Sequence, residues 1–208
     1  MKSGRFLVAT RGLTGPFFAK TVVLLLDYRP ENAGPAEAPP GSTEPPGHRR
    51  GGAWGIIVNR PTRIPLASLL PRYVSTRKQA DKIYVGGPVD PRTMLFLLRA
   101  AEAPPESQQI IDGVHVTGSG ESLLQIIAKD PPTSHFRAFA GYAGWSPGQL
   151  EGEIRRGDWH VTNASADAIF ASDPRRVWNE LVAEHEGLQV FDPMQVPATF
   201  AVRSPLDR

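Results

Sequence analysis

The stretch FRAFAGYAGWSPGQLEGEIRRGDW, from Phe136 to Trp159, predicts a strand, a tight turn and a short helix. In its first half, alanine and glycine are interspersed with aromatic residues, and this composition lets a neighbouring backbone approach closely. We therefore expect a central, tightly covered strand. In its second half, Leu150 and Ile154 are spaced to share one helical face, and Gly157 is typical of a helix end.

The same stretch contains GWSPG at residues 144–148, which fits the GxSxG pattern of a serine hydrolase. In such an elbow, the backbone N–H of the residue after the serine helps to hold the oxyanion. Pro147 has no N–H, so the pattern disfavours a hydrolase. A structural interpretation makes Ser146 the N-cap of the helix, Pro147 its first residue and Gln149 the partner in a capping box. We assign no catalytic residue.

Four stretches of this chain are similar to the YqgE/AlgH family. GYAGWSPGQLEGEI, followed by Asp158 and Trp159, resembles the GYAGWxxGQLExE stretch of that family. The other three are FLVATRGLTGPFFAKTVVLLLDY, GAWGIIVNRP and IYVGGPV. The resemblance implies a bacterial protein with a branched, mostly antiparallel sheet curled into a partial barrel, and helices packed outside it. Through the AlgH branch it also implies a regulator of transcription, in a family of unknown biochemical function.

The composition indicates one soluble domain over residues 1–208. The chain has 208 residues, 40% of them hydrophobic, and no run of apolar residues long enough to span a membrane. The start MKSGRFLVAT lacks the apolar core of a signal peptide, so we expect none. The absence of cysteine excludes disulfides and thiolate chemistry, and it fits a cytoplasmic protein. We expect no membrane partner.

The charges are distributed unevenly along the chain. The 23 basic and 21 acidic residues give a net charge of only +2, although the pI is near 9.1. Residues 1–104 hold 15 Lys+Arg against 7 Asp+Glu, whereas residues 105–208 hold 8 against 14. With no helix-turn-helix pattern and no concentrated basic run, direct binding to nucleic acid is disfavoured.

Local patterns place strands and helices without a regular βαβ rhythm, so the predicted class is α+β. Strands are expected at residues 5–10, 21–28, 53–59, 82–85 and 160–162, with a hairpin over 110–117 around Asp112 and Gly113. Residues 93–99 fit a strand or a short buried helix. Helices are expected at 164–171 and from an Asp173 cap to Gly187. Further expectations are a short helical turn at 65–70, a flexible Pro/Gly-rich insertion at about 30–50, and an extended tail from about 192.

Two glycine-rich stretches raise the question of a cofactor. GSGESLL at 118–124 departs from GxGxxG, and we interpret Ser119 instead as the cap of a helix bearing Leu123, Leu124, Ile126 and Ile127. A phosphate at that helix N-terminus stays an open alternative. Gly86 and Gly87 fit an anion-binding nest, or else a sharp turn or close approach of strands. The five histidines show no metal-binding spacing, so no metal and no cofactor are assigned.

These patterns leave two functional hypotheses beside the hydrolase. The first is a non-enzymatic regulatory or interaction domain whose partner is another protein. Phe17 and Phe18 would form an interaction patch if both were exposed, but we expect at least one to be buried. The second hypothesis is a pocket for a small ligand or anion, although Tyr142 and Trp145 fit the core better, because buried aromatic residues usually belong to it. The residues of this predicted pocket are Asn59, Arg60, Gly86, Gly87, Tyr142 and Trp145.

Overall fold

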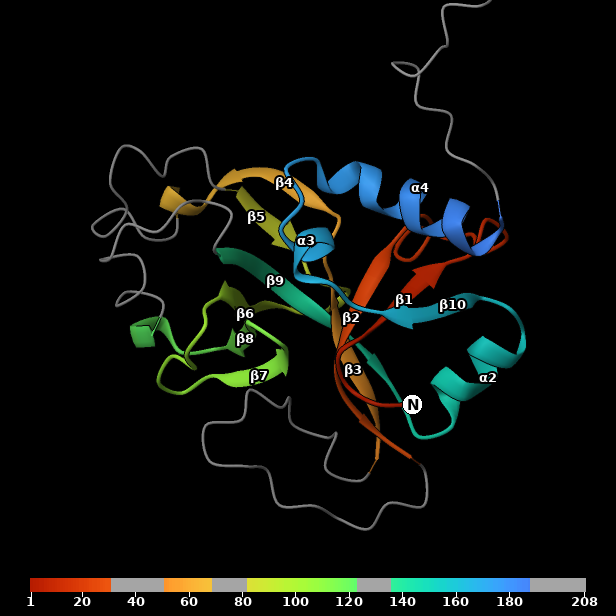
Figure 1. Cartoon of the computed structure of the whole chain (residues 1–208), viewed down its shortest axis with the longest axis horizontal. Coiled ribbons are helices and arrows are strands. Elements are labelled where there is room, and N and C mark those ends of the chain that lie inside the picture. The colour runs from red at the N-terminus through yellow and green to blue at the C-terminus, as the bar shows by residue number, and fades with distance from the viewer. Residues whose placement is uncertain (31–50, 69–81, 123–135, 188–208) are drawn as a thin grey trace, which may run out of the picture.

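The computed structural model describes residues 1–30, 51–68, 82–122 and 136–187, and over these ranges one curled sheet carries a few helices (Figure 1). The strands are β1 (Arg5–Ala9), β2 (Val22–Arg29), β3 (Gly52–Ile57), β4 (Pro61–Pro65), β5 (Lys82–Val85), β6 (Val89–Arg99), β7 (Gln108–Ile111), β8 (Val114–Thr117), β9 (Phe136–Trp145) and β10 (Trp159–Asn163). The helices are the 3-10 turn η2 (Leu66–Ser68), α2 (Gln149–Arg155), α3 (Ala166–Ile169) and α4 (Pro174–His185).

The strand order along the sheet is β10-β1-β2-β3-β9-β6-β8-β7, with β4 and β5 branching from β9. The β5–β9 pair is parallel and the other strand pairs are antiparallel. The sheet curls into a half-barrel and the chain is α+β, which confirms the predicted class and the branched architecture that the family resemblance implied (Figure 1).

Strand β9 is the central strand that its alanine, glycine and aromatic composition predicted. It pairs with β6 along one edge, and with β5 and then β3 along the other. Gly86 joins the branches, because its N–H donates to Ala140 O (2.8 Å) and its carbonyl accepts from Ile57 N (2.7 Å). A Cβ on Gly86 would lie 2.1 Å from Gly141 O, and one on Gly87 would lie 2.2 Å from the Tyr142 carbonyl carbon. The glycine pair therefore permits close approach of strands, one of the interpretations that the sequence left open.

The concave side of the sheet and α4 enclose the main core. Strands β1 and β2 contribute an almost continuous buried run, since β2 is buried from Val22 to Leu26. Helix α4 crosses β1 and β10 and buries Val177, Trp178 and Val182 against them (Figure 1). Burying these apolar side chains stabilises the fold and fixes α4 beside the loop that follows β1.

The local predictions for the second half of the chain are largely confirmed. Residues 89–99 form a strand rather than a helix, and β7 and β8 form the hairpin, with Gly113 at a φ of 65°. Helix α4 begins after Asp173, whose side chain accepts from Arg175 N, and it has Pro174 in its first turn. The predicted helix at 164–171 is shorter, spanning Ala166–Ile169 after a Ser165 cap.

Several predictions fall outside the described residues. These are the insertion over 31–50, the tail from 192, residues 69 and 70 of the predicted turn, and the four apolar residues of the helix after Ser119. The start of that helix is described, and there the Ser119 hydroxyl accepts from Ser122 N at 3.3 Å, as a cap does.

Candidate functional site

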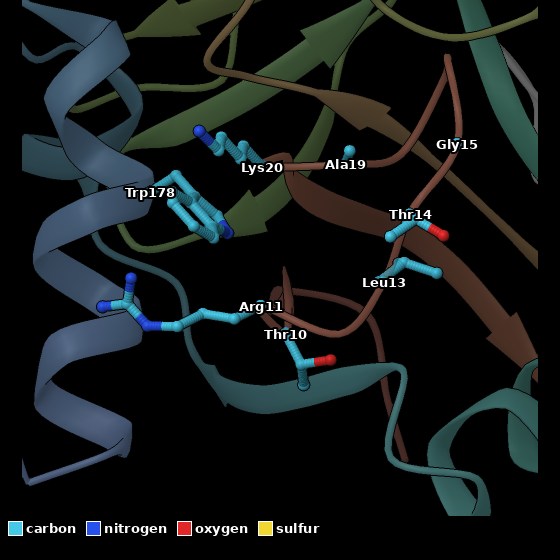
Figure 2. A pocket seen from close by; sticks show the side chains of 8 residues that line it. All are labelled: Thr10, Arg11, Leu13, Thr14, Gly15, Ala19, Lys20 and Trp178. Carbon is cyan, nitrogen blue, oxygen red and sulfur yellow. The ribbon is translucent and has the colours of Figure 1, made fainter.

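The β1–β2 loop (residues 10–21) and helix α4 line a half-open cavity of about 290 Å³. Figure 2 shows the side chains around it, with Lys20 above the Trp178 indole and Arg11 below it in that view. The loop supplies seven of the lining residues and α4 supplies the eighth. The lining residues are Thr10, Arg11, Leu13, Thr14, Gly15, Ala19, Lys20 and Trp178.

Trp178 fixes the helix side of the cavity. Its side chain is 4% exposed, and its Nε1 donates to the carbonyl of Ala9, at the end of β1, at 2.7 Å. The Arg11 guanidinium carbon and the Lys20 ammonium each lie 5.8 Å from the centroid of the indole. Both distances are within the range in which a cation is attracted to an aromatic face. The two ends of the loop thus bring two cations to one aromatic ring.

The Asn59 side chain holds the C-terminal end of the β1–β2 loop in place through two hydrogen bonds. This side chain is 6% exposed, its Oδ1 accepts from Val22 N at 2.9 Å, and its Nδ2 donates to Lys20 O at 3.0 Å. Lys20 has a φ of 57°, a left-handed conformation that few residues other than glycine adopt. The two hydrogen bonds of Asn59 on either side of this turn hold the backbone there, and the Lys20 side chain is directed toward Trp178.

Arg60 supports the same loop a few residues earlier. Its Nη2 donates to Ala19 O at 2.9 Å and its Nη1 donates to Pro16 O at 3.3 Å. Burial lowers the pKa of the Arg60 guanidinium from its usual value. Through these two hydrogen bonds, the Arg60 guanidinium is directed at the loop backbone.

Replacing Asn59 by alanine should lower the free energy of unfolding by about 1 to 3 kcal/mol, since it leaves the buried Val22 N–H without its partner. The measurement is urea unfolding followed by circular dichroism. Lys82→Ala, at an exposed position in β5, is the control and should change stability by less than about 0.5 kcal/mol. Equal stability of the Asn59 variant and the wild type would contradict the role assigned to this side chain.

Three of the six predicted pocket residues, Gly86, Gly87 and Tyr142, lie together at the branch of the sheet, and Arg60 reaches it through its backbone carbonyl alone. Gly87 packs on Tyr142, and the carbonyl of Arg60 accepts from Val85 N, next to Gly86. Tyr142 is 8% exposed, and burial, with a smaller contribution from Asp90, raises the pKa of its hydroxyl.

The other two predicted residues lie apart from this group. The Asn59 side chain is directed at the β1–β2 loop, as described above. Trp145 lies at the end of β9, where its ring is 6.1 Å from those of Phe18 and Trp159. None of the six predicted residues is among those lining the cavity beside Trp178, and their part in ligand binding stays a prediction.

Sequence reasoning missed Arg11, Lys20 and Trp178 as a group. Trp178 was assigned to the apolar side of α4, and that assignment is correct, because the ring is buried. The one local signal was that Arg11 and Lys20 bracket the loop GLTGPFFA, residues 12–19. A contact between residues more than 150 positions apart leaves no trace in a local pattern.

The prediction that Ser146 caps α2 is wrong. The helix begins at Gln149, and its N-cap is Gly148 at a φ of 76°, with no side-chain cap. The chain turns once before the helix, because Gly148 adopts the left-handed conformation that only glycine takes without strain. One half of the expected capping box does form, since Gln149 Oε1 accepts from Ser146 N at 3.1 Å. Pro147 lies in this turn and still offers no N–H beside the serine.

No group of three or more histidine, aspartate or glutamate side chains gathers as a metal site within the described residues. The nearest approach is a stacked pair on β10 and α4, His160 and His185, with ring centroids 4.9 Å apart. Burial and then His185 lower the pKa of His160, against an opposing effect of Glu186. The pair packs α4 on β10.

The model of the AlgH-like family matches residues 47–189 of this chain. The chain belongs to that family. A UPF0301 protein from Methylococcus capsulatus is 33% identical over 189 residues, which cover 89% of this chain and 92% of that one. A UPF0301 protein from Streptomyces coelicolor is 30% identical over 190 residues, covering 89% of this chain and 87% of that one. The family is uncharacterised in function.

Two solved structures have the same fold. The AlgH protein from Pseudomonas aeruginosa is 26% identical with a TM-score of 0.66, and the match covers 89% of this chain and 88% of that one. A protein from Corynebacterium diphtheriae matches with a TM-score of 0.67 at 21% identity, covering 88% and 87%. Within the described residues, no helix combines the length and hydropathy needed to cross a membrane.

Proposed function

We propose that this protein is a non-enzymatic binding protein that holds a small anionic ligand in the cavity between the β1–β2 loop and α4. The observation that carries the proposal is the placement of Arg11 and Lys20, each 5.8 Å from the Trp178 ring, on the wall of a cavity of about 290 Å³. A concave, largely preformed cavity with a few charged groups is the usual form of a small-molecule site.

Preorganisation supports this proposal. Before any ligand arrives, hydrogen bonds from Asn59 and Arg60 hold the loop backbone at Pro16, Ala19 and Lys20, and Asn59 also holds Val22, the first residue of β2. A loop that is already ordered loses less conformational entropy when it binds a ligand. Two of the residues predicted from the sequence, Asn59 and Arg60, thus act as supports of the site rather than as its walls.

The test is a thermal-unfolding screen of small anions and their neutral analogues. A ligand that binds the folded state alone raises the melting temperature as its concentration exceeds Kd. We expect anions to stabilise the wild type, and Lys20→Gln to abolish most of that shift. Lys82→Gln, which removes the same charge at an exposed position in β5, should keep it. Equal shifts of the melting temperature in the wild type, Lys20→Gln and Lys82→Gln would contradict the proposal.

The non-enzymatic part of the proposal rests on Pro147. Ser146→Ala should leave any ester hydrolysis by the purified protein unchanged, because a nucleophile next to an imino acid lacks one oxyanion donor. The measurement is the rate with a chromogenic ester together with labelling by a fluorophosphonate. Stoichiometric labelling of the wild type that disappears in the Ser146 variant would overturn it.

A second candidate function is a regulatory domain that contacts another protein, and Phe17 is the observation that favours it. This side chain is 52% exposed on the same loop, whereas Phe18 packs against Trp145 and Trp159. A ligand in the cavity would then be sensed through the loop, and any effect on transcription would be indirect. We also propose a cytoplasmic location, which the lack of cysteine supports.

This second candidate predicts that Phe17→Ser weakens binding of a purified partner at least about tenfold, the effect of losing one buried aromatic anchor. The variant should keep the melting temperature of the wild type, since the ring is already exposed. Ile64→Ser, at an equally exposed apolar position on β4, is the matched control. Unchanged affinity of the Phe17 variant would count against the loop as the contact surface.

A further inference from the structure

We infer that the ligand of this cavity is a small monocarboxylate with a compact apolar body; the inference rests on the proposed function and narrows its ligand class. Three features carry it: the net charge at the cavity, the character of its wall and its volume.

The charges at the cavity leave one positive charge for the ligand. Arg11 Nε donates to Glu186 Oε2 at 2.6 Å, so this guanidinium is already matched by a carboxylate. Among the described residues, the Lys20 ammonium has no acidic partner and rests on the Trp178 ring. One uncompensated cation suits a singly charged anion, whereas a phosphate dianion would bring a second negative charge close to Glu186.

Two of the polar groups on the wall of the cavity are already engaged within the protein. The Thr10 hydroxyl donates to Gly157 O at 2.9 Å, and the Trp178 N–H donates to Ala9 O at 2.7 Å, so both donors are engaged. What remains beside the cations is the indole ring, Leu13, Ala19, Gly15 and the Thr14 hydroxyl, so apolar groups form most of the rest of the wall. A fully hydrated anion would lose its water against this surface without replacement, but an apolar body would gain from the contact.

The volume limits the size of that body. At about 30 Å³ for each water molecule, a cavity of about 290 Å³ equals the volume of roughly ten waters. This is at or just below the lower end of the range for drug-sized ligands. A benzoate-sized molecule matches this volume. Lys20 and Trp178 lie next to each other on the wall (Figure 2), so they would receive its carboxylate and its ring.

The test is calorimetric titration of the full-length protein with four probes: benzoate, its neutral analogue benzamide, acetate and inorganic phosphate. We expect saturable binding of benzoate, at least about tenfold tighter than that of the other three, as one charge-assisted contact combined with apolar burial predicts. Lys20→Gln should weaken benzoate binding at least about tenfold, Lys20→Arg should retain most of it, and Lys82→Gln should bind as the wild type does.

Each other outcome has a defined meaning. Tighter binding of phosphate than of benzoate, lost in Lys20→Gln, would overturn the monocarboxylate and leave the proposed anion site standing. Tighter binding of acetate than of benzoate would contradict the apolar body of the ligand and leave the inferred carboxylate standing. Benzamide binding as tightly as benzoate, or no binding of any probe, would overturn both. Ala19→Leu, which adds bulk to the wall, gives a second check, because it should block benzoate even where the lysine is intact.

Discussion

Replacing Glu153 by alanine is expected to lower the free energy of unfolding by about 2 to 6 kcal/mol, since each of two buried donors left without a partner costs about 1 to 3 kcal/mol. Glu153 Oε2 accepts from the indole N–H groups of both Trp145 and Trp159, each at 2.8 Å. The two tryptophans are 2% and 4% exposed, so their N–H groups depend on this acceptor. These two bonds tie α2 to the end of β9 and the start of β10, and the same carboxylate also accepts from Gln149 within α2 at 3.0 Å.

The measurement for this prediction is urea unfolding followed by tryptophan fluorescence. Glu184→Ala, which removes a carboxylate from an exposed position on α4, is the matched control and should change stability by less than about 0.5 kcal/mol. A Glu153 variant as stable as that control would show that the two indoles find other partners, and the structural account of the GQLEGE segment would fail.

Replacing Gly87 by alanine is expected to cost at least about 3 kcal/mol or to prevent folding, the upper range for overpacking. A Cβ at this position would lie 2.2 Å from the carbonyl carbon and oxygen of Tyr142 and 2.5 Å from Ala143 N. These are backbone atoms of the central strand, so no side-chain rotation relieves the contact. Strand β9 would have to move away from the segment between β5 and β6.

The yield of soluble protein and its melting temperature measure this effect. The control is Gly120→Ala, because a Cβ there meets nothing within 4 Å and the residue has no positive φ. That variant should fold normally and gain up to about 1 kcal/mol from the reduced entropy of the unfolded chain. A Gly87 variant with a wild-type melting temperature would mean that the strands are not packed as closely as described.

The fold was predictable from local signals where one pattern had one physical meaning. Asp112 and Gly113 predicted the β7–β8 hairpin because a two-residue turn of this kind favours Asp-Gly, and Asp173 with Pro174 located the start of α4. Ser146 misled because Ser-Pro is also a good start of a turn. The glycine two positions later then decided where the helix begins. The curl and the branch came from the family resemblance, since pairings between distant strands leave no local pattern.

The candidate site was predictable only in part, for a related reason. The sequence placed Asn59 and Arg60, two polar residues at the end of a strand, in the predicted pocket, and their side chains contact the β1–β2 loop. Their role could not be deduced, because the backbone carbonyls that they bind belong to residues some 40 positions earlier in the chain. The cavity itself depends on how α4 crosses β1, which places Trp178 beside Ala9. Packing of this kind is set by the whole core.

The most direct test of the ligand site is a titration with benzoate followed by the indole N–H signals of a ¹⁵N-labelled sample. The chain has four tryptophans, and Trp178 alone lines the cavity. We expect a saturable shift of the Trp178 signal, while the signals of Trp54, Trp145 and Trp159 stay in place. A shift of Trp145 with Trp178 unmoved would instead favour the site predicted from the sequence, and four unmoved signals would contradict ligand binding at either place.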